Sequence, residues 1–357
     1  MTPVRGGRLI PSKNQQGREA IIRGSGNLTR RGWLVGAAAG TIGFGARAAD
    51  APLDVAIANQ DGSGTHIMTE LMLGQHYFEA FGLKPKFNFI LGSQPIIDSL
   101  MSGASDVCMG SGISNVIAAI AGGAPLRLLA GANQRIVQAI FSAKPDIRTL
   151  KDLEGRRVGS GPKGQLVHQI IVAAMLKYGA DPGKVEFVNL GATATIFKSV
   201  AKGEIDAGTG EADVYENQAK YGVHVLEHGV LWDELPNYAQ QGSYASLNAI
   251  RTRREPIVRT LAAHARAYRF VQTPQSHDAY VAARARALGQ VDASESETQW
   301  RFYQRLKPFA ENLTLTEPQV RYIQELNMAM GLQKQVAPFE AVVDNSLARE
   351  AIARLKA

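Results

Sequence analysis

Residues 84–110 read KPKFNFILGSQPIIDSLMSGASDVCMG, and residues 184–210 read KVEFVNLGATATIFKSVAKGEIDAGTG. The two stretches align without a gap at an offset of 100 residues and share seven identical residues. Each begins with an apolar run typical of a buried strand, continues with an amphipathic segment typical of a helix, and ends in a second strand-like run. Strand, helix and strand in this order predict a parallel βαβ unit. The repeat therefore predicts two similar lobes.

Each copy of the repeat also carries residues that begin and end helices. Ser93 and Thr193 follow the first strand-like run, where a hydroxyl oxygen can accept a hydrogen bond from an unpaired N–H group, so both are predicted helix N-caps. Gly103 and Gly203 follow the amphipathic segment, at the place where a left-handed residue ends many helices. We therefore expect two lobes that each direct a helix start towards a shared crevice.

The composition is that of a globular protein with room for two domains. The chain has 357 residues, 45% of them hydrophobic, and 36 glycines. Its formal charge of +7 comes from the first 48 residues, which hold eight Lys and Arg against one Glu, whereas the remaining 309 hold 31 basic and 31 acidic residues. Because the balanced part carries no basic stripe with interleaved aromatic residues, no nucleic-acid partner is expected.

Residues 1–48 have the pattern of an export signal. Arg30 and Arg31 precede a Gly/Ala-rich apolar run that is too short to span a bilayer, which needs ~20 residues. The small residues of Ala46-Arg47-Ala48 predict cleavage near Ala48/Ala49. The arginine pair resembles a twin-arginine signal, with Trp33 where that motif has Phe, and an ordinary Sec signal is the alternative. We expect a periplasmic protein without a lipid anchor, since no cysteine follows the run.

Neither the cysteine nor the histidines predict a metal or redox centre. Cys108, the only cysteine, lies in a strand-like run, where a buried thiol acts as a small hydrophobic group. His224 and His228 also lie in a strand-like segment, with no third ligand near them in the sequence. The glycines at 62–64 lack the spacing of a phosphate-binding or dinucleotide-binding loop. No metal and no cofactor are expected.

Residues 150–161 read LKDLEGRRVGSG and precede a helical pattern from Gln165 to Tyr178. This stretch resembles the periplasmic solute-binding proteins of ABC importers, in the SsuA/THI5-like (NMT1-like) group that binds sulfonates, nitrate, taurine and thiamine precursors. Three further stretches match that group, namely YFEAFGL at 77–83, LMSGASDV at 100–107 and SVAKGEIDA at 199–207. Together the resemblance covers roughly residues 53–270.

The resemblance implies an α/β protein with the two-lobed, type II periplasmic-binding-protein fold. Each lobe would be a mixed, mostly parallel sheet flanked by helices, and a helical C-terminal region would follow. The expected parts are residues 49–133 for the first part of lobe I, 134–243 for lobe II, and 244–357 for the return to lobe I and the C-terminal helices. A strand at 244–250 would carry the return, and helical patterns at 276–288, 294–306, 316–330 and 347–355 are interpreted as packing.

The function that the resemblance implies is capture of a small solute by hinge closure between two lobes, followed by docking on an inner-membrane permease. The protein would be a monomer and not an enzyme. The alternative from a different functional class is an exported hydrolase. It is less favoured because Ser111 and Ser160, although they lie in Gly-flanked turns, lack the G-x-S-x-G pattern of a nucleophile elbow.

Ligand-binding groups are expected in the loops at the carboxyl ends of the strands. The candidates are Gln60, Ser63, Thr65, Ser93, Gln94, Ser111, Ser160, Lys163, Gln165, Glu211 and Asp213. Helix N-termini and Lys163 favour a sulfonate- or carboxylate-type anion. Glu211 and Asp213 instead favour an amine or a pyrimidine amino group, or serve only their own helix start. Ser111 likewise either contacts the ligand or starts a helix.

Overall fold

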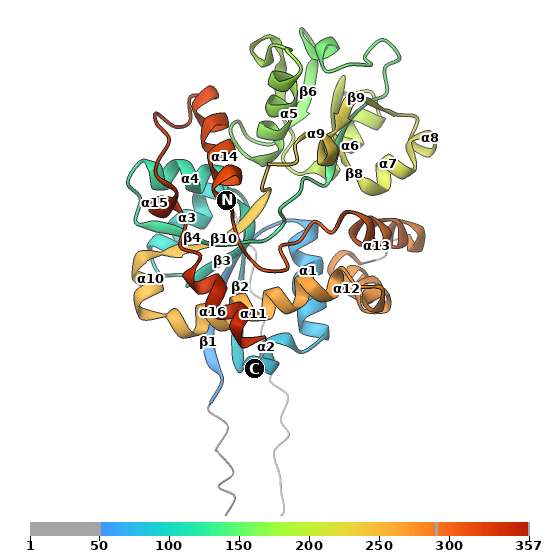
Figure 1. The fold of residues 1–357 in the computed structure, drawn as a ribbon. Coiled ribbons are helices and arrows are strands. Elements are labelled where there is room, and N and C mark those ends of the chain that lie inside the picture. Colours follow the sequence, from blue (N-terminus) through green and yellow to red (C-terminus); the bar gives the residue numbers. More distant parts are fainter. Residues whose placement is uncertain (1–50, 290–291, 356–357) are drawn as a thin grey trace, which may run out of the picture. The chain divides into compact units, whose positions relative to one another are not determined.

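The computed structural model describes residues 51–289 and 292–355, whose strands form two five-stranded sheets (Figure 1). The first sheet contains β1 (Leu53–Gln60), β2 (Leu83–Ile90), β3 (Val107–Gly112), β4 (Leu126–Gly131) and β10 (Gln241–Ser246). The second contains β5 (Gln138–Ser142), β6 (Arg157–Ser160), β7 (Glu186–Asn189), β8 (Ala207–Glu211) and β9 (His224–Val230). The expected signal peptide, residues 1–48, lies outside the described residues. Within these, no helix is long and apolar enough to cross a membrane.

The two sheets have the same strand order. The first runs β2-β1-β3-β10-β4, and the second runs β7-β6-β8-β5-β9. In each, the first three strands are parallel and the fourth is antiparallel to both neighbours. The fourth strand, β10 or β5, is also the first strand after the chain passes from one sheet to the other. The prediction of two mixed, mostly parallel sheets flanked by helices is confirmed.

The sequence repeat corresponds to β2, α3 (Ser93–Met101) and β3 in one sheet, and to β7, α6 (Thr193–Ala201) and β8 in the other. Its repeated aspartate has the same structural role in both copies. A carboxylate oxygen of Asp106 accepts a hydrogen bond from the N–H of Ala56 in β1, at 2.9 Å. A carboxylate oxygen of Asp206 accepts one from the N–H of Arg157 in β6, at 2.7 Å. Each aspartate thus satisfies a backbone donor of the adjacent parallel strand.

The helix ends of the repeat agree only in part with the sequence. Gly103 and Gly203 have φ values of 76° and 71°, in the left-handed region that the C-terminal prediction required. The predicted N-caps are wrong, because Ser93 and Thr193 are the first residues inside their helices. The cap positions belong to the residues before them, and neither helix has a side-chain cap hydrogen bond.

The remaining helices cover the sheets and form most of the C-terminal region (Figure 1). They are α1 (Ser63–Gly74), α2 (Tyr77–Ala80), α4 (Ser114–Ala121), α5 (Leu166–Lys177), α7 (Ala212–Glu216), α8 (Gln218–Tyr221), α9 (Leu231–Glu234), α10 (Leu247–Thr252), α11 (Arg254–Val271), α12 (His277–Leu288), α13 (Ala293–Leu306), α14 (Glu317–Ala329), α15 (Phe339–Val342) and α16 (Ser346–Arg354). The four C-terminal helices predicted after residue 275 correspond to α12, α13, α14 and α16.

Two elements differ from the sequence expectation. Ile67, Leu71 and Phe78 follow helical spacing and predict one helix to about Ala80. The structure interrupts it at His76, whose φ of 53° is incompatible with a continuing helix. The strand expected at 244–250 begins earlier, at Gln241, and ends at Ser246. There the Ser246 hydroxyl accepts a hydrogen bond from the N–H of Ala249 and starts α10.

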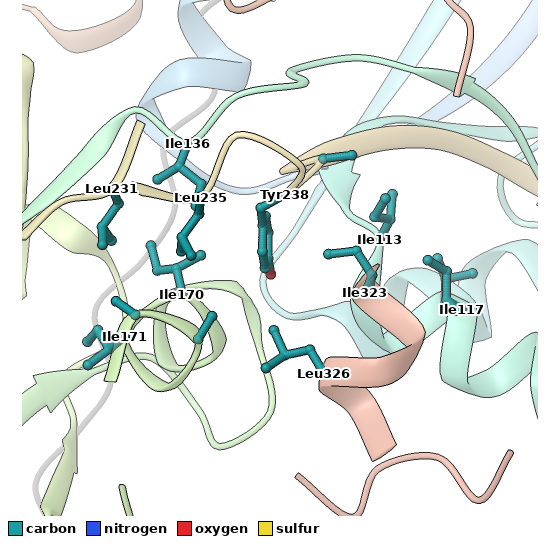
Figure 2. Packing of buried hydrophobic residues seen from close by; sticks show 14 of the residues in the cluster. Ile113, Ile117, Ile136, Ile170, Ile171, Leu231, Leu235, Tyr238, Ile323 and Leu326 are labelled. Carbon is teal, nitrogen blue, oxygen red and sulfur yellow. The ribbon is translucent and has the colours of Figure 1, made fainter. Parts of the chain in front are cut away.

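The largest hydrophobic cluster joins elements of both sheets (Figure 2). It includes Ile117 of α4, Ile170 of α5 and Ile323 of α14, all fully buried. Tyr238, in the segment between α9 and β10, lies among them (Figure 2). The two sheets are therefore connected by packed side chains and a C-terminal helix as well as by the two crossing segments.

Candidate functional site

A cavity of about 490 Å³ is lined by the carboxyl ends of strands from both sheets. The first sheet contributes residues 59–65 and 91–93, which follow β1 and β2. The second contributes residues 161–162 and 191–194, which follow β6 and β7, and Glu211 at the end of β8. Small ligands bind in this position in open α/β sheets, and the volume lies within the usual range for small-molecule sites.

Six of the residues predicted from the sequence line this cavity: Gln60, Ser63, Thr65, Ser93, Gln165 and Glu211. The other five are not among its lining residues: Gln94, Ser111, Ser160, Lys163 and Asp213. The cavity thus brings together predicted residues that lie at or follow the ends of β1 and β2 of the first sheet and β6 of the second, together with one residue at the end of β8.

Strand alternation and exposure explain why some candidates are excluded. Ser111 lies between two lining glycines, and successive residues of a strand point to opposite faces. The hydroxyl of Ser160 donates to the Gly161 carbonyl at 2.9 Å. Gln94 is exposed and donates to Asp98 of its own helix at 2.9 Å. Lys163, the cation on which the anion prediction depended, is exposed to solvent.

Four helices begin at the cavity wall. Their first residues or the residues just before them line it: Ser63 for α1, Ser93 for α3, Gln165 for α5 and Thr193 for α6. The first N–H groups of a helix have no partner within the helix, and the helix dipole places partial positive charge there. Gly92, with φ 91°, makes the turn into α3 in a conformation that favours glycine. These helix starts can hold an anion.

The side-chain charges of the wall are acidic. No lysine or arginine is among the described residues that line the cavity, whereas Asp61 and Glu211 are. Burial and, to a smaller extent, the Asp213 carboxylate raise the pKa of Glu211, Arg284 lowers it, and the net result is a pKa of about 7. At neutral pH this carboxyl group therefore exchanges readily between its neutral and ionised forms.

Aromatic and amide side chains complete the wall. The rings of Tyr268 and Phe309 stack with centroids 5.3 Å apart, and Tyr303 meets Phe309 edge-on at 5.2 Å. His264 also lines the cavity, and burial lowers its pKa to about 4, so it is neutral at pH 7. Gln240 is 3% exposed, and its Oε1 has no hydrogen-bond partner.

Sequence reasoning missed this part of the site. Gln138 and Gln240 lie at the segments in which the chain crosses between the sheets. Tyr303 belongs to a helix that was interpreted as packing, and Tyr268 belongs to α11, for which no site residue was predicted. A polar residue in a crossing segment has no local pattern that separates it from an ordinary loop residue. The aromatic positions follow the same helical periodicity as core residues.

The described residues supply neither a reactive thiol nor a metal centre here. Cys108 is fully buried in β3, and burial raises the pKa of its thiol to about 12. A thiol in that state is a poor nucleophile. Residues 51–289 and 292–355 contain no group of three His, Cys, Asp or Glu side chains placed to hold a metal ion.

The sequence profile of NMT1/THI5-like proteins matches residues 67–276, which run from within α1 to just beyond α11 and include every strand except β1. The chain belongs to the NMT1/THI5-like family. No curated protein sequence matches this NMT1/THI5-like chain.

Solved structures show the fold of this NMT1/THI5-like protein. The alkanesulfonate-binding protein SsuA from Xanthomonas axonopodis pv. citri, bound to MOPS, is 18% identical with a TM-score of 0.65, covering 82% of this chain and 99% of that one. The aliphatic sulphonate binding protein SsuA from Escherichia coli is 19% identical, with a TM-score of 0.66 and coverage of 84% and 99%. The desulfurization enzyme DSZB is 16% identical, with a TM-score of 0.56 and coverage of 84% and 99%. The fold is that of periplasmic binding proteins, as expected.

Proposed function

We propose that this protein is the periplasmic substrate-binding component of an ABC importer. It captures a small organic solute between its two lobes, closes over it by bending at the crossing segments, and delivers it to an inner-membrane permease. The observation that carries the proposal is the cavity itself, since its wall is built from loops of both sheets. A solute that contacts both walls favours the closed arrangement through its differential affinity for that state.

The favoured ligand class is a small organic anion of the sulfonate or carboxylate type. Four helix starts supply N–H donors and partial positive charge, and none of the described residues that line the cavity is a lysine or arginine. Each charge-assisted hydrogen bond contributes ~1.5–3 kcal/mol. Two similar folds are described as sulfonate-binding proteins, which agrees with this class.

An amino-bearing heterocycle, such as a thiamine-precursor pyrimidine, is the second candidate ligand. Glu211 favours it, because a carboxyl group is an acceptor for an amino group and a poor neighbour for a second anion. The aromatic rings of Tyr268, Tyr303 and Phe309 also favour a ligand with an apolar or aromatic body.

An enzymatic function is the alternative of a different class, because DSZB shares the fold. The candidate nucleophiles Cys108 and Ser111 do not favour it, and neither lines the cavity. The only cysteine, Cys108, is buried and protonated. Ser111, one of the serines that a hydrolase could use, has no hydrogen-bond partner for its hydroxyl, so no base activates it. A binding protein needs no such group.

The proposal is tested by a thermal-shift screen of the purified mature chain with ethanesulfonate, benzoate, nitrate and pyrimidines, followed by calorimetry. A true ligand at 100 times its dissociation constant stabilises the protein by ~2.7 kcal/mol. Thr193→Trp, which fills the cavity, should abolish the shift, whereas Thr195→Trp, on the exposed face of the same helix, should preserve it. Chemical conversion of a bound compound would overturn the proposal in favour of an enzyme.

A further inference from the structure

We infer that α14 and the turn after it, residues 317–332, form an interlobe clasp that is fixed to the first sheet and holds the second lobe against it. Its residues Asn327 and Leu332 position the second lobe without contacting the solute, since neither lines the cavity. Separation of the lobes then requires release of the clasp, which controls how fast a solute is exchanged. The effect on exchange rests on the proposed solute-binding function, whereas the clasp itself does not.

The clasp is anchored to the first sheet on both sides of α14. Before the helix, the carbonyl of Leu313 accepts a hydrogen bond at 2.8 Å from the N–H of Gly131, the last residue of β4. After the helix, the N–H of Asp344 donates to the carbonyl of Leu128, also in β4, at 2.8 Å. Because backbone hydrogen bonds hold both flanking segments to the same strand, α14 moves with the first lobe.

Asn327 bonds to both lobes through one side chain. Its Nδ2 donates to the carbonyl of Ser114, in α4 of the first lobe, at 3.0 Å, and its Oδ1 accepts from the Ser114 hydroxyl at 2.7 Å. The same Oδ1 accepts from Nε2 of Gln169, in α5 of the second lobe, at 2.6 Å. All three residues are buried. Moving α5 away from α14 breaks the bond to Gln169, which is costly because a desolvated group loses a partner.

The end of α14 brings a second side chain to the other lobe. Gly331 has φ 72°, a left-handed conformation that ends helices, and the N–H of Leu332 then donates to the Asn327 carbonyl at 2.8 Å. The Leu332 side chain lies against Gly164, where an added Cβ atom would be 2.9 Å from a Leu332 methyl carbon. Gly164 belongs to the loop after β6, of which residues 161–162 line the cavity. Leu332 therefore supports part of the cavity wall from behind.

Apolar side chains surround the polar contacts of the clasp (Figure 2). Ile323 and Leu326, from α14, are buried in one cluster with Ile117 of α4 and Ile170 of α5. Moving α5 away would expose part of this cluster, at a cost of ~25 cal/mol for each square ångström of apolar surface. Polar and apolar contacts thus oppose the same movement.

The cavity walls themselves meet beside the clasp. A Cβ atom added to Gly112, the last residue of β3, would lie 3.6 Å from the Cβ atom of Leu166, the first residue of α5. Both residues line the cavity, and they belong to different lobes. Opening the cavity here separates α5 from the first lobe, which is the movement that the clasp opposes. The clasp therefore favours the arrangement in which both walls can contact a solute.

The first test measures the shape of the protein without added ligand. Asn327→Ala and Leu332→Ser should each increase the radius of gyration in solution scattering, at a temperature where circular dichroism shows every variant to be folded. Met328→Ser is the matched control, because Met328 is apolar, 40% exposed against 37% for Leu332, and belongs to α14. It should leave the radius unchanged. Equal radii for the wild type and all three variants would overturn the clasp, since a merely stabilising contact does not change the shape of the folded protein.

The second test measures exchange of ethanesulfonate or benzoate, whichever gives the larger thermal shift. In stopped-flow tryptophan fluorescence, Asn327→Ala and Leu332→Ser should raise the dissociation rate constant about fivefold or more, and Met328→Ser should not change it. Unchanged or slower dissociation in both clasp variants would overturn the inference, because the contacts would then not hold the lobes together around a solute. If neither probe binds the wild type, the proposed anion class is wrong, and the radii of gyration still decide whether the clasp exists.

Discussion

The side-chain amide of Gln169, in α5, donates to the hydroxyl of Ser114, in α4, at 2.6 Å. The two helices follow strands of different sheets, so this hydrogen bond joins the lobes directly. The same amide donates to Asn327 of α14 at 2.6 Å, and its oxygen accepts from the hydroxyl of Tyr238 at 2.5 Å. All four residues are buried, and Tyr238 belongs to the hydrophobic cluster that connects the lobes. The amide thus links four segments of the chain.

Gln169→Ala should destabilise the protein by about 2–5 kcal/mol, because it leaves buried polar partners unpaired and removes packed atoms. Urea unfolding would measure the loss. Gln94→Ala is the matched control, since that exposed glutamine bonds only within its own helix, and it should change stability by no more than ~0.5 kcal/mol. Equal effects of the two substitutions would show that the buried network does not stabilise the fold.

Glu211→Gln should stabilise the ligand-free protein at pH 8. The pKa of Glu211 is about 7 in the folded protein and ~4.3 in the unfolded chain. This group therefore contributes its full stabilisation at pH values below ~4.3, and the contribution is lost as the pH rises through 7. The expected gain is about 1–3 kcal/mol at pH 8, as for relief of a poorly solvated charge, and close to zero at pH 5. Denaturation at both pH values, with exposed Glu325→Gln as the control, measures it. A gain that is the same at both pH values would contradict the raised pKa.

Lys163→Ala should leave affinity for ethanesulfonate or benzoate nearly unchanged. From the sequence this lysine was expected to strengthen anion binding about tenfold, but its side chain is exposed and does not line the cavity. Calorimetry on the variant distinguishes the two expectations, because a tenfold change in the dissociation constant corresponds to ~1.4 kcal/mol of binding free energy. A tenfold loss would mean that the loop after β6 moves to bring Lys163 to the bound anion.

Export through the twin-arginine route predicts that Arg30→Lys together with Arg31→Lys retains the precursor in the cytoplasm. The wild-type chain should yield a mature protein that begins near Ala49. Cell fractionation followed by N-terminal sequencing measures both outcomes. Normal export of the double variant in a strain that has only the Sec route would establish an ordinary Sec signal instead.

Much of the fold could be predicted because its determinants are local. The repeat of strand, helix and glycine predicted both βαβ units, and the repeated Asp106 and Asp206 satisfy equivalent backbone donors. The helix caps were less predictable, because a glycine before Ser93 or an alanine before Thr193 can occupy the cap position itself. When two neighbouring residues can both adopt the backbone conformation of the cap position, the local sequence does not show which of them is the cap and which is the first helical residue.

The candidate site was predictable only where it follows a strand. Gln60, Ser93 and Glu211 lie at or just after strand ends, which the pattern of apolar runs locates. Tyr303 and Gln240 reach the same cavity through long-range packing, and nothing in their neighbours marks them. The ligand charge was uncertain for the same reason. It depends on which charged side chains face the cavity, and Lys163 and Glu211 differ in this respect although both lie at or just after a strand end.

The position of β10 has a consequence for how the chain is made. Leu126 of β4 and Ser246 of β10 are direct partners, although every strand of the second sheet lies between them in the chain. The second sheet comes from one uninterrupted segment and can assemble first, whereas β3 and β4 lack the strand between them until residues 241–246 have been synthesised. Non-local pairing of this kind slows folding and leaves strand edges open to other chains. A nascent chain therefore passes through a stage in which its N-terminal half needs protection from aggregation while its middle is already folded.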